Sequence, residues 1–200
     1  MRLTSEETEL LRSSTDLPFV LTAREHLRLA ELWDTAIASS ATVLEALLGY
    51  SAAFDPQVQQ TRPHQGSIET ARVIRRLVAG STLIDSRPAA VSAHNLLQDA
   101  YSLRGIPPVE GAALDSWSLG RRLIEQQLAR ISEGKTPNPV VLTLVSDLDA
   151  TAATVLAGIA ERRTFRMNDP ALSKDLPENL VPRPGPHSGY MIPQYTAAAL

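Results

Sequence analysis

One long stretch of helical periodicity constrains the fold of this chain more than any other feature. Between Ala23 and Leu48 apolar side chains recur every three or four residues, at Leu27, Ala30, Trp33, Ile37, Leu44, Leu47 and Leu48. The pattern stops at Gly49 and predicts a helix of about 26 residues, roughly 40 Å at 1.5 Å per residue. Because a helix of this length needs other long helices to cover its apolar side, the sequence predicts an all-α bundle within a larger assembly.

Capping signals indicate where the first helices begin. Thr4 and Glu7 have the spacing of a capping box, in which each side chain bonds the other residue's backbone N–H, and they open a short helix. Thr22 and Glu25 repeat this spacing just before the long helix. The chain is therefore expected to consist of two parts, an N-terminal extension (residues 1–22) and a helical domain (residues 23–200).

Four further helices are expected along the chain, at residues 67–78, from about 88 to 98, from 109 to Gly134 as a C-terminal cap, and from Ser146 through Arg163. The last forty or so residues contain repeated prolines, which prevent a long helix there. The β-branched run at residues 140–145 is too isolated to build a sheet. The predicted fold is an all-α bundle of long helices with an irregular, Pro-rich C-terminal segment.

Composition excludes several classes of function. The chain has no cysteine, so disulfides, a thiolate nucleophile and Cys-ligated metals are excluded. Its formal net charge is -3 and its basic residues form nothing larger than Arg pairs, which we expect on solvated helix faces, so nucleic acid is not an expected partner. The four histidines show no pair at metal-ligand spacing, and no metal site is expected.

The N-terminal residues carry no targeting signal that we recognise. The first seven residues are acidic and lack the apolar core of a signal peptide, and no window approaches about 18 uncharged apolar residues. We therefore expect a cytoplasmic protein without a membrane segment.

Chemistry is concentrated in the segment Gln98-Asp99-Ala100-Tyr101-Ser102-Leu103-Arg104, which holds an amide, a phenol and a guanidinium. On one helix Gln98, Tyr101 and Arg104 would share a face that could bind an amino acid's carboxylate and handle a proton beside it. Two plainer interpretations remain open from spacing alone. Tyr101 could simply pack against a neighbour at a helix end, and Arg104 could pair only with Asp99 or Glu110.

The same seven residues resemble the signature of the histidine, phenylalanine and tyrosine ammonia-lyases. A second signature, Gly189-Tyr190-Met191-Ile192-Pro193-Gln194-Tyr195-Thr196-Ala197-Ala198-Ala199-Leu200, closes the chain. Further landmarks follow in the family's order: Phe54-Asp55-Pro56, Asn138-Pro139-Val140, Ala160-Glu161-Arg162-Arg163 and Asp169-Pro170-Ala171-Leu172. The resemblance covers residues 23–200. It implies a long-helix bundle similar to the central helical core of these enzymes.

This resemblance implies specific roles. Enzymes of the family eliminate ammonia from histidine or an aromatic amino acid, using a methylidene-imidazolone electrophile formed from an internal Ala-Ser-Gly. By the resemblance, Arg104 would bind the substrate carboxylate through two parallel hydrogen bonds, which suits a planar guanidinium. Tyr101 would be catalytic and handle a proton, and Gln98 would hydrogen-bond within the site. The supporting residues would be Asn138, beside the site's backbone, and Gln194, at the start of a site-forming helix.

Departures from the family pattern limit these expectations. The chain has no Ala-Ser-Gly, so it cannot form the electrophile, and the segment after Asn138-Pro139 lacks the Asn-Phe-His loop that helps to line the pocket in relatives. We therefore expect a portion or subunit of an ammonia-lyase, inactive alone, whose electrophile lies on a partner chain or in a missing half. Family sites are assembled from several subunits, so the partner would be a homo-oligomer or a complementary chain. The alternatives are a non-catalytic structural or regulatory relative and a decayed fragment.

Overall fold

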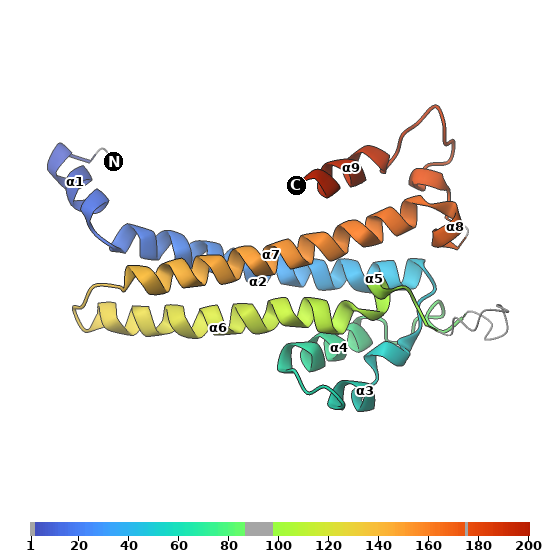
Figure 1. The fold of residues 1–200 in the computed structure, drawn as a ribbon, viewed down its shortest axis with the longest axis horizontal. Helices are drawn as coiled ribbons and strands as arrows, with labels where there is room; N and C mark the ends of the chain where they lie inside the picture. Colours follow the sequence, from blue (N-terminus) through green and yellow to red (C-terminus); the bar gives the residue numbers. More distant parts are fainter. Residues whose placement is uncertain (1–2, 87–97, 175) are drawn as a thin grey trace.

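Three long helices lie side by side and form the body of the molecule (Figure 1). They are α2 (Asp16–Ala46), α6 (Ile106–Ser132) and α7 (Pro139–Asn168), and each packs against the other two. The computed structural model describes residues 3–86, 98–174 and 176–200. In these ranges the structure contains helices and an isolated bridge but no strand, which confirms the all-α prediction. The helix predicted from about residue 88 lies almost wholly outside the described residues.

Short helices pack around or extend from the three long helices. They are α1 (Ser5–Ser13), η1 (Ser51–Phe54), α3 (Pro56–Gln60), α4 (Gln65–Leu77), α5 (Tyr101–Arg104), α8 (Pro170–Ser173), η2 (Glu178–Leu180) and α9 (Met191–Ala199). Helices α3, α4 and α5 gather at one end, whereas α1 projects from the other and α9 folds back over α7 (Figure 1). The short elements after α7 confirm that the Pro-rich segment forms no long helix.

The N-terminal helix boundaries were predicted in part. The capping box is present, because the Thr4 N–H donates to Glu7 Oε2 at 2.8 Å and the Glu7 N–H donates to Thr4 Oγ1 at 3.2 Å. The predicted start of the long helix at Ala23 is wrong, since α2 already begins at Asp16. Pro18 lies in its first turn, where backbone N–H groups have no intrahelical acceptor and a proline costs little. The expected boundary between residues 22 and 23 therefore falls inside α2.

The start of α7 was also placed wrongly, at Ser146. The helix begins at Pro139, directly after Asn138, whose side-chain oxygen accepts the Val140 N–H at 3.0 Å. Such a cap followed by a first-position proline is a strong helix start. At the preceding helix end the prediction is confirmed: Gly134 has a φ of 74°, the left-handed conformation of a glycine that follows a helix.

A buried ion pair joins the long helices. Arg163 of α7 donates to Glu110 of α6 at 2.7 Å, and their side chains are 2% and 0% exposed. Ser40 of α2 donates its hydroxyl to the same carboxylate oxygen, and Trp33 donates to the Glu110 carbonyl at 3.1 Å. Burial raises the pKa of Glu110, and the Arg163 guanidinium opposes that rise. The expectation that Arg162-Arg163 sits on a solvated face is thus wrong for Arg163.

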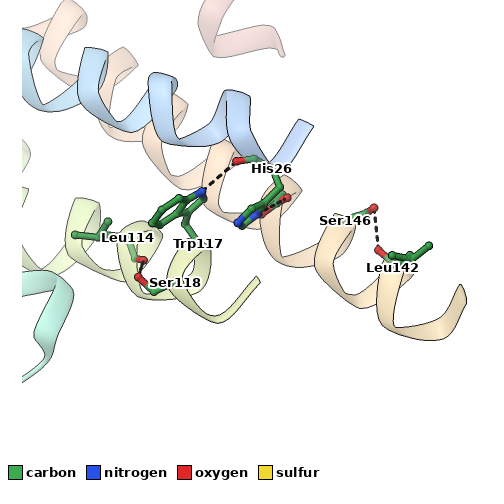
Figure 2. Close-up of polar contacts among 7 residues, drawn as sticks. His26, Leu114, Trp117, Ser118, Leu142 and Ser146 are labelled. Carbon is green, nitrogen blue, oxygen red and sulfur yellow. Dashed lines mark hydrogen bonds and ion pairs between the residues drawn. The ribbon is translucent and has the colours of Figure 1, made fainter. Parts of the chain in front are cut away.

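A second polar contact ties α2 to α7 nearer the other end of the bundle. His26 Nδ1 lies 3.0 and 3.1 Å from the two carboxylate oxygens of Asp149, and burial raises the pKa of that carboxyl. The His26 ring stacks on Trp117, whose indole N–H donates to the His26 carbonyl at 3.0 Å (Figure 2). His26 therefore has a packing role, and no cluster of metal-ligating side chains occurs among the described residues.

Helix α7 is long and apolar enough to cross a membrane by length and composition alone. The most apolar window of this helix has a mean hydropathy of 1.6. However, α7 packs against both α2 and α6, and its Asp149 is bonded to His26 of α2. A polar group is costly to remove from water unless it is hydrogen-bonded, and His26 and Asp149 satisfy each other between two helices of this chain. Length and hydropathy alone are therefore weak grounds here for a membrane segment.

Two glycines set how closely α4 approaches α6. A Cβ added at Gly66 would lie 1.9 Å from the Gly111 carbonyl oxygen, and one added at Gly111 would lie 2.4 Å from the Ser67 nitrogen. Both added Cβ atoms would collide with backbone atoms, which, unlike the end of a flexible side chain, cannot rotate out of the way. The Gly66 N–H also donates to Asp115 at 2.8 Å. These contacts fix α4, and with it the loop before it, against α6.

Replacing Gly111 by alanine should therefore destabilise the protein by about 2 kcal/mol or more, because the new methyl group overpacks a backbone contact. Gly158→Ala on α7 is the matched control, since a Cβ there meets nothing within 4 Å. That variant should be neutral or up to about 1 kcal/mol more stable, owing to the higher helix propensity of alanine. Chemical denaturation followed by circular dichroism measures both, and equal effects would refute the role of the Gly66–Gly111 contact.

Candidate active site

A cavity of about 490 Å³ lies at the end of the bundle that carries α3, α4 and α5. Two segments form its walls, residues 50–67 and residues 98–108. The residues that line it are Tyr50, Ala52, Ala53, Val58, Gln59, Thr61, Arg62, His64, Ser67, Gln98, Asp99, Tyr101, Arg104 and Pro108. Its volume falls within the range of small-molecule sites.

All three residues singled out in the 98–104 segment reach this cavity, but not by sharing a helix. Gln98 lies in a bend, Ala100 has extended backbone with a ψ of 152°, and α5 begins only at Tyr101. The expected common helix face is therefore wrong for Gln98, whereas Tyr101 and Arg104 do share α5. The buried Asp99 carboxylate accepts the Tyr50 N–H at 2.7 Å and so connects the two walls. This turn brings Gln98 beside Tyr101 and Arg104 at one cavity.

Arg104 keeps its guanidinium available. It is exposed, and its guanidinium carbon lies 5.3 Å from the centre of the Tyr101 ring, a cation–π contact. Glu110, one of the two acids considered for it, is bonded to Arg163 instead. Within the described part of the chain no carboxylate forms an ion pair with Arg104. Tyr101 is 57% exposed, so it is not a buried packing residue within this chain.

Other cavity residues were not identified from the sequence. Tyr50, Arg62 and His64 line the same space, and Gln59 is held in the wall by donating its amide to the Ala53 carbonyl at 2.7 Å. The sequence shows residues 62–66 only as a loop rich in turn-forming residues. An arginine and a histidine in a short loop between two helices are the one signal that could have pointed to them.

The two supporting residues lie elsewhere. Asn138 caps α7 with its side chain. Its backbone N–H donates to the side-chain oxygen of Gln127 at 2.8 Å. It lies beyond the far end of α6, a helix of 27 residues, at the opposite end of the bundle from α5 (Figure 1). Gln194 lies in the first turn of α9 and donates to the Glu161 carboxylate of α7 at 2.5 Å. One chain therefore does not bring Asn138 or Gln194 to the cavity.

The residues present do not fit a methylidene-imidazolone formed by this chain. That group requires three consecutive residues, Ala-Ser-Gly, and the sequence contains none. The nearest approach, Ala38-Ser39-Ser40, lies within α2, where the Ser40 hydroxyl donates to Ala36 and Glu110. A helical, core-bonded segment is unsuited to backbone cyclisation.

Comparison with known proteins places the chain in a family. The family described as aromatic amino acid lyase matches residues 1–200. Histidine ammonia-lyase from Treponema denticola is 35% identical over 187 residues, which cover 85% of this chain and 35% of that protein. Histidine ammonia-lyase from Gloeobacter violaceus is 38% identical over 197 residues, which cover 90% of this chain and 36% of that protein. The chain thus spans little more than a third of the length of these relatives.

Solved structures agree with this relationship. Tyrosine aminomutase from Streptomyces globisporus superposes with a TM-score of 0.79 at 30% identity, over 93% of this chain and 41% of that one. Histidine ammonia-lyase from Trypanosoma cruzi superposes with a TM-score of 0.77 at 27% identity, over 100% of this chain and 38% of that one. With the match to the whole sequence, these similarities show that the chain belongs to the aromatic amino acid lyase family.

Proposed function

We propose that this chain supplies the carboxylate-binding and proton-handling part of an ammonia-lyase site, acting on histidine or an aromatic amino acid. One observation carries the proposal: the exposed Arg104, which forms no ion pair with a described residue, lies against an exposed Tyr101 at the cavity lined by Gln98. Arg24 and Arg121 pair with neighbouring carboxylates, whereas other exposed arginines such as Arg122 form no ion pair with a described residue, so the position of Arg104 at the cavity is what distinguishes it. A guanidinium left free beside a phenol can bind an external carboxylate.

The chemistry follows from the side chains. The Arg104 guanidinium offers two parallel N–H donors, which match a carboxylate and fix its orientation. The Tyr101 hydroxyl, on the residue three positions earlier in α5, can then exchange a proton with the bound amino acid. The Gln98 amide can donate to and accept from the same ligand. These three residues bind and orient, but none of them activates the amino group as a leaving group.

We further propose that the electrophile comes from outside these 200 residues, either on a partner chain of an assembly or in a missing half of the same protein. These 200 residues contain no Ala-Ser-Gly from which it could form. The chain also exposes 12749 Å² of surface, compared with roughly 9,200 Å² for a compact 21.7 kDa monomer. Surface in such excess is typical of a subunit that is covered by partners.

The exposed side of α7 supports such an assembly. Large apolar side chains are exposed along it at Val140, Leu144 and Val155. From residue 139 to 158 the exposed positions of this helix include a single charged residue, Asp147. Depletion of charge around apolar side chains is characteristic of the buried centre of a protein interface.

A non-catalytic role, as a structural or regulatory subunit, is the second candidate. The observation that favours it is Asn138, which remains far from the cavity while the loop after it is shortened and α7 begins at once. In that case the cavity would be a remnant and the long helices would carry the function. The two candidates differ in what Arg104 and Tyr101 contribute to activity.

The purified chain alone should show no ammonia-lyase activity, because it has no electrophile to make the amine a leaving group. Ultraviolet absorbance of the unsaturated acid follows the reaction with histidine, phenylalanine and tyrosine. A boiled sample is the control, and intact mass spectrometry excludes a contaminating lyase. Turnover by the clean chain would refute this prediction.

In an active complex with an electrophile-bearing partner, Arg104→Lys should lower kcat/KM roughly tenfold to a hundredfold. Lysine keeps the charge but loses the bidentate geometry, and a charge-assisted hydrogen bond is worth about 1.5–3 kcal/mol. Tyr101→Phe should lower kcat while leaving the ring and the fold in place. Arg122→Lys, on an exposed part of α6, is the control. Near-normal rates in both site variants would favour the structural role.

Self-association is the third expectation. The wild-type chain should sediment as an oligomer, because α7 exposes large apolar side chains among residues that include a single exposed charge between positions 139 and 158. Leu144→Glu and Val155→Glu should shift it to the monomer, since each buries a charge at the interface. Leu77→Glu, at the end of α4, changes an equally exposed leucine elsewhere. Sedimentation velocity distinguishes the cases, and a stable wild-type monomer would contradict the prediction.

A further inference from the structure

The described lining of the cavity carries more positive than negative charge. Among its described lining residues Arg62 and Arg104 are cations, and Asp99 is the one carboxylate. With His64 neutral the formal charge of the lining is therefore positive by one unit. The Asp99 carboxylate is also committed to the Tyr50 N–H. A zwitterionic amino acid has no net charge, so a ligand with one further anionic group would complement this lining better.

The two guanidiniums come from different walls. Arg62 lies in the turn between α3 and α4, whereas Arg104 is the last residue of α5. Neither forms an ion pair with a described residue. Other arginines do so, namely Arg24, Arg28, Arg72, Arg121, Arg162 and Arg163. With respect to the described residues, Arg62 and Arg104 thus both offer N–H donors that no carboxylate occupies at one cavity.

The turn that presents Arg62 is ordered by its own hydrogen bonds. The Arg62 N–H donates to the Gln59 carbonyl at 3.3 Å, and the His64 N–H donates to the Arg62 carbonyl at 2.8 Å. Four residues after Arg62, Gly66 is fixed against Gly111 of α6. The backbone under Arg62 is therefore tied to the bundle that also carries Arg104, and only the side chain is left to adjust to a ligand.

We propose that Arg62 is a second anion-binding residue of this cavity, and that the preferred substrate is an aromatic amino acid with an additional anionic group on its side chain. The inference rests on the proposed function. Arg104 binds the α-carboxylate and Arg62 binds the second anion. Arg62 is then the residue that determines specificity, because it distinguishes acids with one anionic group from acids with two.

The test compares two unsaturated acids that differ in one charge, trans-cinnamate and 4-carboxycinnamate. Isothermal titration calorimetry measures their binding to the full chain at an ionic strength of about 0.15 M, where long-range attraction is screened. The dianion should bind about tenfold more tightly, the effect of one additional charge-assisted contact. The 4-methoxy analogue, similar in size but with a single charge, should bind like cinnamate.

Three variants identify which arginine is responsible for the preference for the dianion. Arg62→Gln should remove the preference for the dianion and leave the Kd of cinnamate within about twofold, whereas Arg104→Gln should weaken both acids about tenfold. Arg122→Gln, which removes an exposed charge outside the cavity, should change neither. Circular dichroism and thermal melts show that each variant remains folded, as expected for exposed side chains.

The outcomes separate this inference from the proposed function. If cinnamate binds through Arg104 but the dianion gains nothing, or keeps its advantage in Arg62→Gln, the inference is wrong and the proposed function stands. If neither acid binds, or Arg104→Gln has no effect, both are wrong. Loss of the preference in Arg122→Gln would show attraction to the whole protein rather than to Arg62, and would also overturn the inference.

Discussion

The ion pair between Glu110 and Arg163 is the interaction on which the rest of the structure depends. Both side chains are buried, and the Ser40 hydroxyl joins them, so one polar cluster connects α6, α7 and α2. Removing two charges from water is costly, and an uncompensated buried charge costs several kcal/mol more. The three helices can therefore pack in this register, with both partners in place, far more favourably than in one shifted by a residue.

This pair also determines the chemistry of the cavity. Glu110 follows Arg104 by six residues at the start of α6, so it was one of two acids that could have neutralised Arg104. Because Arg163 binds Glu110 inside the bundle, that carboxylate is unavailable at the surface. Asp99 is likewise engaged by the Tyr50 N–H. That no described carboxylate pairs with Arg104 is thus a consequence of how the core and the turn use the neighbouring carboxylates.

The sequence predicted the long elements well and the site only in part. Periodicity found α2 and α6, because a long apolar stripe is a local property that packing preserves. Periodicity misplaced the start of α7, because the β-branched side chains among residues 140–145 lower the helix propensity there. Burial of Leu142 and Val145 in the bundle overrides this low propensity. The buried Arg163 could not be predicted, since its partner lies 53 residues away in sequence.

The cavity residues were also only partly predictable, because some of them are close in space but far apart in the sequence. Tyr101 and Arg104 could be found because they are neighbours on one short helix, whereas Arg62 reaches them only through the packing of α4 on α6 at Gly66 and Gly111. No spacing rule connects residues 62 and 104. The glycine contact is what converts a loop between two helices into a wall of the cavity. A change at Gly111 should consequently disturb ligand binding as well as stability, although Gly111 is not a lining residue.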